Sequence, residues 1–241
     1  MTTNLEVPAR ALAIGAHPDD VEFGCGGTLA KWAAAGCEVS HLVCTDGSKG
    51  SWEPSEDTAA LVLTRQEEQR AAARALGATG AVVFLGWRDG ELESGLRQRA
   101  DVCSWIRRLR PDVVLGHDPW KRYRLHPDHR HAGFLAVEGV VAARDPHFFP
   151  EQGAPHHRSS ALLLWEADEP DHVEDITSSL DGKLAALLEH RSQYRSTMEI
   201  NDSSSAEQRA RFADRIAGRA AEHGAAAGFT YGERFVLLTR T

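Results

Sequence analysis

The chain has 241 residues, a net charge of −8 at pH 7 and a hydrophobic content of 42%. These values suit a single α/β domain with a sizeable core, and they argue against a general nucleic-acid-binding surface, which would be basic. No run approaches the roughly 18 consecutive apolar residues of a membrane span, and Met1–Arg10 lacks the apolar core of a signal peptide, so we expect a cytoplasmic protein.

Cysteine chemistry is not expected to build a site in this chain. The four cysteines form no C-x-x-C pair, and three of them lie in or beside apolar runs, as buried free thiols do. We therefore expect neither disulfides nor a thiolate metal site. The cysteines are Cys25, Cys37, Cys44 and Cys103.

Short apolar runs alternate with helical segments along the chain, without repeats or linkers. Strands are predicted at 11–16, 38–45, 81–86, 113–116, 160–166 and 235–238. Helices are predicted at 28–35, 63–76, 95–109, 127–143, 176–190 and 206–226. The apolar side of the third helix is predicted to hold Leu96, Val102, Ile106 and Leu109. This alternation predicts one α/β domain over residues 1–241, with a mostly parallel sheet covered by helices on both faces.

Polar side chains follow several predicted strands. Asp19, Asp46 and His117 each come just after a strand's carboxyl end. In parallel sheets ligands bind outside the carboxyl ends of the strands. The sequence therefore predicts one shared pocket at this edge of the sheet, with the loop at 48–57 lying over it.

The first candidate motif spans Ala16–Glu22, at the end of the first predicted strand. His17 and Asp20 are three residues apart and can turn toward one ion, while Pro18 stiffens the backbone between them. Asp19 should then point elsewhere and be free to act as a base. Alternatively, the two aspartates only cap the following helix, although adjacent carboxylates after a buried strand are costly without a cation.

The second candidate motif spans Leu125–Arg130, at the start of a predicted helix. His126 and His129 are three residues apart, so both can lie on one side of the first turn. The helix dipole alone would favour Asp128 at this position, but Asp128 can also orient one of the histidine rings. His131 is expected to face away from the site.

Four segments occur in an order and spacing that resemble the PIG-L/LmbE-like family. They are Ala16-His17-Pro18-Asp19-Asp20 followed by Gly-Gly-Thr, Thr45-Asp46-Gly47, Arg65-x-x-Glu68, and His126-Pro127-Asp128-His129. The family includes N-acetylglucosaminylphosphatidylinositol de-N-acetylase, deacetylases of mycothiol and bacillithiol synthesis, and glycopeptide-antibiotic sugar deacetylases. The resemblance implies a Rossmann-like three-layer fold and a single catalytic zinc.

The resemblance also implies roles for individual residues. His17, Asp20 and His129 match the zinc ligands, and Asp19 matches the general base. His126 resembles the histidine that stabilises the oxyanion or acts as an acid, and Asp128 is its neighbour in the motif. Arg65 resembles an arginine that helps to hold the sugar, and Tyr123 is an approximate counterpart of a tyrosine in mycothiol-type members.

Two imidazoles and one carboxylate leave one position open on a four-coordinate zinc, as in catalytic sites. We therefore expect a hydrolase in which metal-activated water removes an acyl group, expected to be acetyl, from the amide nitrogen of a small N-acylated sugar or related metabolite. Asp19 would take the proton, and zinc and protonated His126 would stabilise the oxyanion. Iron(II) also suits this ligand set.

The chain departs from the family pattern in places. Ser48 replaces the glutamate of a Gly-Glu pair, so a carboxylate that could touch the substrate is missing. Tyr123, Trp120 and Trp52 are candidates for an aromatic floor under a sugar or acyl chain. Arg65 could instead belong to a solvated, charged helix face.

Other functions fit less well. Gly24-x-Gly26 suggests a dinucleotide-binding loop, but Leu29 stands at the third glycine position and Asp19 would repel a pyrophosphate. A non-catalytic zinc- or sugar-binding module would not need a base. An amidase acting on thiol-sugar conjugates or on an antibiotic intermediate is a variant of the hydrolase. We expect no nucleic-acid partner and no membrane span, and the sequence leaves the oligomeric state open, a homo-oligomer included.

Overall fold

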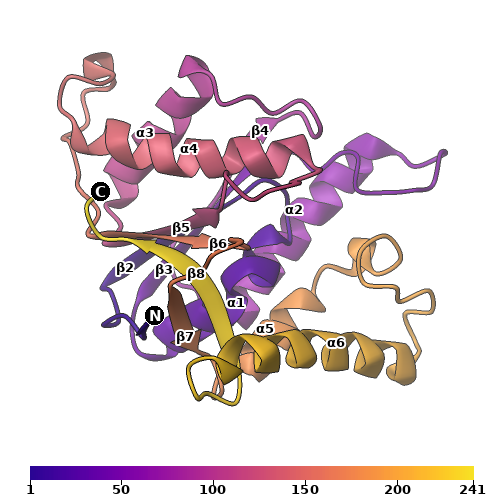
Figure 1. The fold of residues 1–241 in the computed structure, drawn as a ribbon. Helices are drawn as coiled ribbons and strands as arrows, with labels where there is room; N and C mark the ends of the chain where they lie inside the picture. The colour runs from indigo at the N-terminus through magenta and orange to yellow at the C-terminus, as the bar shows by residue number, and fades with distance from the viewer.

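One eight-stranded sheet organises the molecule (Figure 1). The computed structural model describes residues 1–241, and the strands follow the spatial order β1-β7-β8-β6-β5-β2-β3-β4. All neighbouring strands are parallel except β8, which runs antiparallel to β6 and β7. The strands are β1 (Thr2–Thr3), β2 (Arg10–Gly15), β3 (Glu38–Thr45), β4 (Val82–Trp87), β5 (Val113–His117), β6 (Ala161–Trp165), β7 (His172–Asp175) and β8 (Gly232–Leu238).

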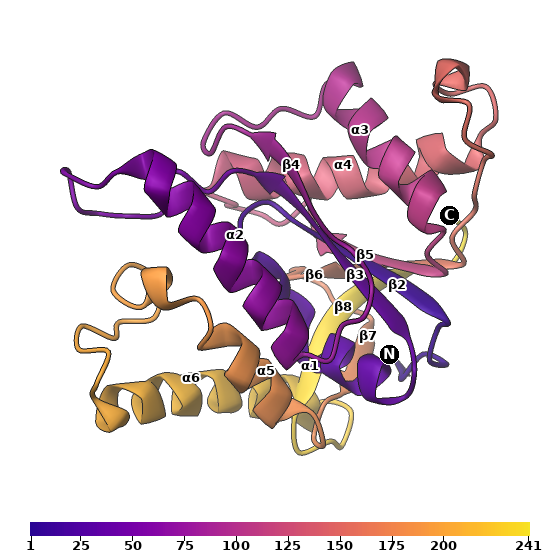
Figure 2. The same ribbon diagram turned by 180° about the vertical axis from the view of Figure 1, so that it is seen from behind.

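Helices cover both faces of this sheet (Figures 1 and 2). Leu12 and Ile14 of β2 pack under α3 and α4, whereas Ala11 and Ala13 face α1 and its neighbours, because successive residues of a strand point to opposite faces. The predicted three-layer α/β architecture with a mostly parallel sheet is thus confirmed. The helices are α1 (Asp20–Ala34), α2 (Thr58–Ala75), α3 (Leu96–Leu109), α4 (Pro127–Arg144), α5 (Leu180–Leu187) and α6 (Ala206–Ala225).

The largest departure from the predicted elements is in α1, which begins at Asp20 and not near residue 28. Its glycines serve close packing. A Cβ on Gly24 would lie 2.6 Å from the indole of Trp165. The helix is interrupted at Cys25, whose φ and ψ of −147° and 18° are not helical.

Glu233 of β8 compensates for this interruption. Where a helix restarts, its first N–H groups have no intrahelical partners. The Glu233 carboxylate accepts the N–H groups of Gly27 at 2.9 Å and Thr28 at 2.8 Å, and it pairs with Lys183 at 2.6 Å. The last strand therefore supports the helix that begins at the site.

The other differences are smaller. Strands β1 and β7 were not predicted, because they are short and lack apolar runs. Helix α5 covers only part of the predicted segment at 176–190. On α3, Val102 and Ile106 are buried as predicted, but Leu96 is 69% exposed because it lies in the first turn, beyond the sheet.

The strand order brings the predicted loops together. β2 lies between β3 and β5, so the loops after these parallel strands leave from the same edge of the sheet. A crevice forms where chain connections diverge to either side of such a strand. All four cysteines are buried and free. None of the helices is long and apolar enough to cross a bilayer.

Replacement of Gly24 by alanine is predicted to destabilise the fold by about 1–3 kcal/mol, because the fully buried Trp165 ring has no room to move. Gly218 lies within α6 and has open space at its Cβ position, so Gly218→Ala should instead stabilise by roughly 0.5–1 kcal/mol. Urea unfolding of both variants measures the difference. Equal stabilities would contradict the packing role assigned to Gly24.

Candidate metal and catalytic site

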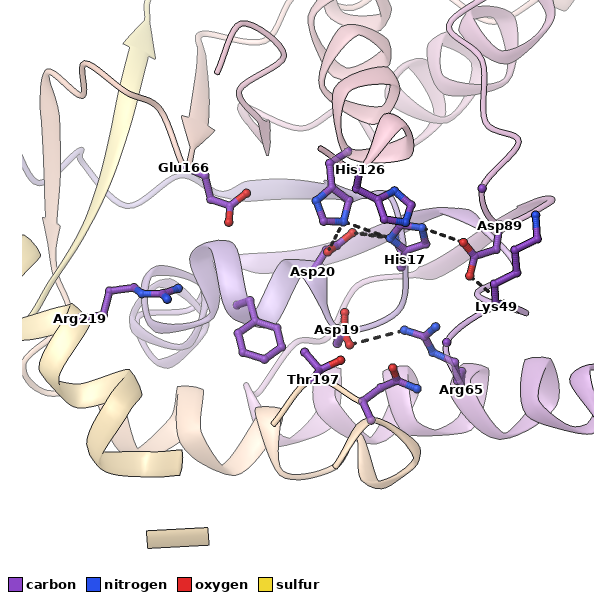
Figure 3. A pocket seen from close by; sticks show the side chains of 15 residues that line it. His17, Asp19, Asp20, Lys49, Arg65, Asp89, His126, Glu166, Thr197 and Arg219 are labelled. Carbon is purple, nitrogen blue, oxygen red and sulfur yellow. Dashed lines mark hydrogen bonds and ion pairs between the residues drawn. The ribbon is translucent and has the colours of Figure 1, made fainter. Parts of the chain in front are cut away.

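A pocket of about 490 Å³ opens at the carboxyl edge of the sheet (Figure 3). The loop after β3 contributes Lys49 and Gly50 to its wall, as predicted for the loop at 48–57. Of the eight predicted site residues, Asp128 lies behind the pocket against His17, and Tyr123 lies outside it. The other six line the pocket, namely His17, Asp19, Asp20, Arg65, His126 and His129.

The three predicted metal ligands bring their donor atoms together, although the two motifs are far apart in the sequence. His17 Nδ1 lies 3.2 Å from His129 Nε2 and 3.5 Å from Asp20 Oδ2. His129 Nε2 lies 3.3 Å from Asp20 Oδ1. Ligands held about 2.0–2.1 Å from a tetrahedral zinc are about 3.3 Å from one another. The observed spacing therefore fits one small divalent cation.

The charges around His17 also fit a cation. Asp20, Asp89 and Asp128 are all buried around its ring, and buried carboxylates need compensating positive charge. Burial opposes the charged imidazole, but hydrogen bonds to these three carboxylates outweigh burial and raise the pKa of His17 well above its usual value. Burial lowers the pKa of His129 to about 4, so this ring is neutral at pH 7, as a metal ligand must be.

Asp128 orients His17 and not a histidine of its own motif. His17 Nε2 lies 3.1 Å from Asp128 Oδ2 and 3.2 Å from Asp89 Oδ1. Asp128 is itself held by the N–H groups of Gly90 at 2.6 Å and Leu92 at 3.2 Å. A carboxylate behind an imidazole fixes its tautomer and direction. The ring is thereby held with Nδ1 toward the other two candidate ligands.

His117 adds a further ring next to the candidate ligands. Overlapping groups of side chains here could hold an ion, and one consists of Asp20, His117 and His129. However, His117 Nδ1 accepts the indole N–H of Trp165 at 3.0 Å, so the hydrogen of the neutral ring is on Nε2. Nε2 lies 3.3 Å from Asp20 Oδ2. Nε2 of His117 is buried and faces the Asp20 carboxylate without forming a hydrogen bond. A nitrogen that carries hydrogen cannot ligate a metal, so His17, Asp20 and His129 remain the candidate ligand set.

Asp19 has a strained backbone. Its φ of 101° is in the left-handed region, which costs of order 1–3 kcal/mol for a residue other than glycine. Its backbone N–H donates to Oε1 of Gln69 at 3.0 Å, and this bond holds the conformation. Although Asp19 occupies the N-cap position of α1, its side chain makes no capping hydrogen bond. The strain therefore accompanies a carboxylate that faces the pocket.

Arg65 is buried, so the alternative of a solvated helix face is wrong for this residue. Its guanidinium donates to the carbonyls of Pro18 and Gly47, and lies 3.5 Å from Asp19 Oδ2. Gly47 has a φ of 66°, and a Cβ there would lie 2.9 Å from the guanidinium. Arg65 thus braces the loop after β2 against the loop after β3. It also lines the pocket, so a contact with substrate stays a prediction.

The carboxyl group of Asp19 is tuned toward neutral pH. Burial raises its pKa, the positive charge of Arg65 opposes that effect, and the net result is a pKa of about 6. A general base is most effective when its pKa lies near the working pH. Asp19 therefore has the protonation behaviour and the position expected of a base.

A fully buried polar network lies behind Asp19. Gln69 Nε2 donates to Glu22 Oε1 at 2.7 Å, and His190 Nε2 lies 3.2 Å from Glu22 Oε2. Burial disfavours the charged form of His190, but its hydrogen bond to Glu22 and the negative charges of Glu22, Asp19 and Glu68 together outweigh burial and raise its pKa. The backbone of Asp19 is therefore tied, through one glutamine, to a buried ion pair.

His126 is the N-cap residue of α4. Its ring was expected to be protonated, but its surroundings favour the neutral form. Its Nδ1 accepts the backbone N–H of Asp128 at 3.3 Å, which requires an unprotonated Nδ1 and leaves the hydrogen on Nε2. Burial lowers its pKa, and the charge of nearby His17 lowers it further. His126 is thus a neutral hydrogen-bond donor at the pocket.

The predicted aromatic floor is absent from the pocket. Tyr123 is 85% exposed, Trp52 is 82% exposed, and neither contributes to the pocket wall. Trp120 packs edge-on against Phe134 of α4 instead. Tyr123 and Trp120 belong to the loop after β5 and Trp52 to the loop after β3. Phe23 of α1 is the single hydrophobic residue of the wall.

Asp89 and Gln69 also contribute to the site but were not predicted, and the sequence contains a recognisable signal only for Asp89. Asp89 follows β4 closely, so the rule that drew attention to the ends of the other strands could have found it. Gln69 lies in the middle of α2, and nothing in the pattern distinguishes it from neighbouring polar residues. Only the fold brings it to the backbone of Asp19.

Comparisons with known proteins agree with this geometry. The sequence profile of the GlcNAc-PI de-N-acetylase family, PIG-L, matches residues 12–140. A diacetylchitobiose deacetylase of Thermococcus kodakarensis is 37% identical, over 77% of this chain and 70% of that protein. A 1D-myo-inositol 2-acetamido-2-deoxy-alpha-D-glucopyranoside deacetylase of Streptomyces avermitilis is 34% identical, over 61% of this chain and 58% of that protein. The solved structure of N,N'-diacetylchitobiose deacetylase from Pyrococcus horikoshii, in complex with an inhibitor, is similar with a TM-score of 0.85 and 32% identity, over 96% of this chain and 84% of that one.

Replacement of Gln69 by leucine should destabilise the protein by roughly 2–4 kcal/mol, because the buried Asp19 N–H loses its hydrogen-bond acceptor and Oε1 of Glu22 loses the hydrogen bond from Gln69. Gln66 is on the same helix, half-buried and without a side-chain hydrogen bond, so Gln66→Leu should change stability by less than about 0.5 kcal/mol. Urea unfolding compares the two variants. A Gln69→Leu protein as stable as the Gln66→Leu protein would refute the bracing role.

Proposed function

Because this chain belongs to the PIG-L family of GlcNAc-PI de-N-acetylases, we propose that it is a metal-dependent N-deacetylase. Its substrate would be a small N-acetylated sugar or a related metabolite, and its products acetate and a free amine. One observation carries this proposal. The donor atoms of His17, Asp20 and His129 lie 3.2–3.5 Å apart, next to a buried carboxylate, Asp19, that is not part of the ligand set.

His17, Asp20 and His129 would hold the metal, and we propose zinc. Zinc bound at this position would lower the pKa of water toward about 7 and polarise the amide carbonyl. Iron(II) is the alternative for two imidazoles and one carboxylate. Asp128 and His117 would act through the ligands, since Asp128 holds the ring of His17 and Nε2 of His117 lies 3.3 Å from Asp20 Oδ2.

Asp19 would be the general base. It would take a proton from the attacking water and then transfer it to the leaving nitrogen as the C–N bond breaks. His126 would donate its Nε2–H to the oxyanion that forms on the carbonyl oxygen. A positioned donor of this kind typically contributes about 3–4 kcal/mol to lowering the barrier. Because Nδ1 of His126 is occupied by the Asp128 N–H, Asp19 is the better proton carrier.

The wall of the pocket suits a sugar more than an acyl chain. Phe23 is the single hydrophobic residue among the 15 that line it, and Lys49, Arg65, Gln193 and Thr197 offer polar groups. Hydroxyl groups need hydrogen-bond partners when they leave water. The proposed substrate class follows from this polarity as well as from the relatives.

An amine-release assay over a panel of N-acetylated sugars tests the proposal. The panel includes N-acetylglucosamine, diacetylchitobiose and 1D-myo-inositol 2-acetamido-2-deoxy-alpha-D-glucopyranoside. We expect at least one of them to release amine, a chelator to abolish the release, and added Zn²⁺ to restore it. A metal-loaded protein that releases no amine from any sugar would favour the binding-module alternative.

Variants separate the base from the ligands. Asp19→Asn should retain the metal and lower kcat/KM by about 10²–10⁴, the usual contribution of a general base. His129→Ala should lose the metal and the activity together. His131→Ala is the matched control, because His131 contacts Ser94 and faces away from the pocket, and it should keep both. Elemental analysis measures the metal content of each variant alongside the activity assay. Loss of metal in Asp19→Asn would show that Asp19 is a ligand and not a base.

A further inference from the structure

A second cavity, of about 290 Å³, adjoins the catalytic pocket and shares Glu166 and Arg219 with it. In Figure 3 these two side chains lie at the side of the pocket away from Asp89 and Lys49. Glu166 directly follows β6, and Arg219 belongs to α6. We name this second cavity the cationic cavity, after the residues that line it, which are Lys121, Glu166, Ala167, Arg219, His223 and Arg234.

Three cations of the cationic cavity have no carboxylate partner. Lys121, Arg219 and Arg234 form no ion pair, and Nε of Arg234 is buried without a hydrogen-bond partner. Arg219 is exposed, whereas Lys121 and Arg234 are half-buried. A charged group that is partly removed from water costs free energy unless an opposite charge or hydrogen bonds compensate it, and this cost applies to Lys121 and Arg234. In a chain with a net charge of −8, three such cations around one cavity create a local region of positive potential.

The carboxylates near the cationic cavity are already paired. Glu166 forms an ion pair with Arg124 and lies 3.6 Å from Nδ1 of His117. Glu233 accepts the ammonium group of Lys183 at 2.6 Å and supports the interrupted helix α1. Neither carboxylate is therefore free to neutralise the three cations.

His223 responds to this positive potential. Burial lowers its pKa, and the charges of Arg234, Lys183 and Arg219 lower it further, to about 4. The ring is neutral at pH 7 and can exchange hydrogen bonds with a ligand without adding charge.

We propose that the cationic cavity binds a phosphate or carboxylate group carried by the substrate, while the N-acetyl group of the same molecule lies in the catalytic pocket. The inference rests on the proposed deacetylase function and narrows its substrate class. Planar guanidinium groups form paired, charge-assisted hydrogen bonds with both kinds of anion. Arg219 lines both cavities, so one sugar with an acidic substituent can reach both.

The test compares neutral and anionic N-acetylated sugars on the metal-loaded protein. The probes are N-acetylglucosamine, its 1-phosphate, its 6-phosphate, and N-acetylmuramic acid, which carries a carboxylate. We expect kcat/KM for at least one anionic sugar to exceed that of the neutral sugar by about tenfold or more, with a preference that weakens as ionic strength rises. A preference among the three anionic probes distinguishes phosphate from carboxylate.

Two variants test whether the preference for anionic sugars comes from the cationic cavity. Arg234→Gln and Lys121→Gln should each reduce the ratio of anionic to neutral kcat/KM at least threefold, mainly through KM for the anionic sugar. Arg211→Gln is the matched control, because Arg211 is exposed on α6 and paired with Glu207, and it should leave the ratio unchanged. Lys121 lies in a loop, so its variant keeps the test decisive if Arg234→Gln fails to fold.

Equal kcat/KM values for neutral and anionic sugars would overturn the inference, as would a preference that survives in both variants. Calorimetric binding of N-acetylglucosamine 6-phosphate separates this failure from failure of the proposed function. Binding that depends on Arg234 without release of amine would support the cavity and refute the deacetylase. Release of amine without an anionic preference would refute the cavity and leave the deacetylase standing.

Discussion

The environment of His17 is the constraint on which the site depends. Three buried carboxylates converge on this one imidazole, and they come from the loops after β2 and β4 and from the start of α4. Asp128 and Asp89 contact Nε2 of His17, so Nδ1 of the same ring faces Asp20 and His129. Buried negative charge of this density is stable only around positive charge. The same contacts that join the two motifs therefore favour a cation between them.

Asp19 shows how the fold supports an unfavourable local conformation. Its left-handed backbone separates its carboxylate from that of Asp20, although the two residues are adjacent in sequence. Strain of this kind persists only where surrounding contacts determine the conformation. Gln69 accepts the N–H of Asp19, and Arg65 donates to the carbonyls of Pro18 in the same loop and of Gly47 in the loop after β3. Helix α2 thus supplies the stabilisation that the proposed division of roles requires, with Asp20 as a metal ligand and Asp19 as a base.

The carboxyl-terminal part of the chain connects the fold to the choice of substrate. On β8, Glu233 and Arg234 are successive residues and so point to opposite faces of the sheet. Glu233 supports the interrupted helix α1, which begins at Asp20, whereas Arg234 lines the cationic cavity. Glu166 pairs with Arg124 beside His117, so it does not neutralise the cations of the cationic cavity. Strand β8 therefore supports helix α1 at the candidate metal site and also supplies a positive charge to the neighbouring cationic cavity.

The sequence by itself determined the parallel sheet, the edge that carries the site, and the family, because strand-helix alternation and two rigid His-Pro-Asp segments are local patterns. It also identified His17, Asp20 and His129, whose donor atoms the fold brings together. Only the tertiary structure decided that Asp128 acts on His17, that Arg65 is buried, that His126 is neutral, and that Tyr123 lies outside the pocket. The first two of these properties depend on contacts between distant segments, namely between Asp128 and His17, which are 111 residues apart, and between Arg65 and Pro18, which are 47 residues apart. Hydrogen bonding and burial at such distances leave no periodic signal in the chain, so Gln69 and the unpaired cations could be recognised only after folding.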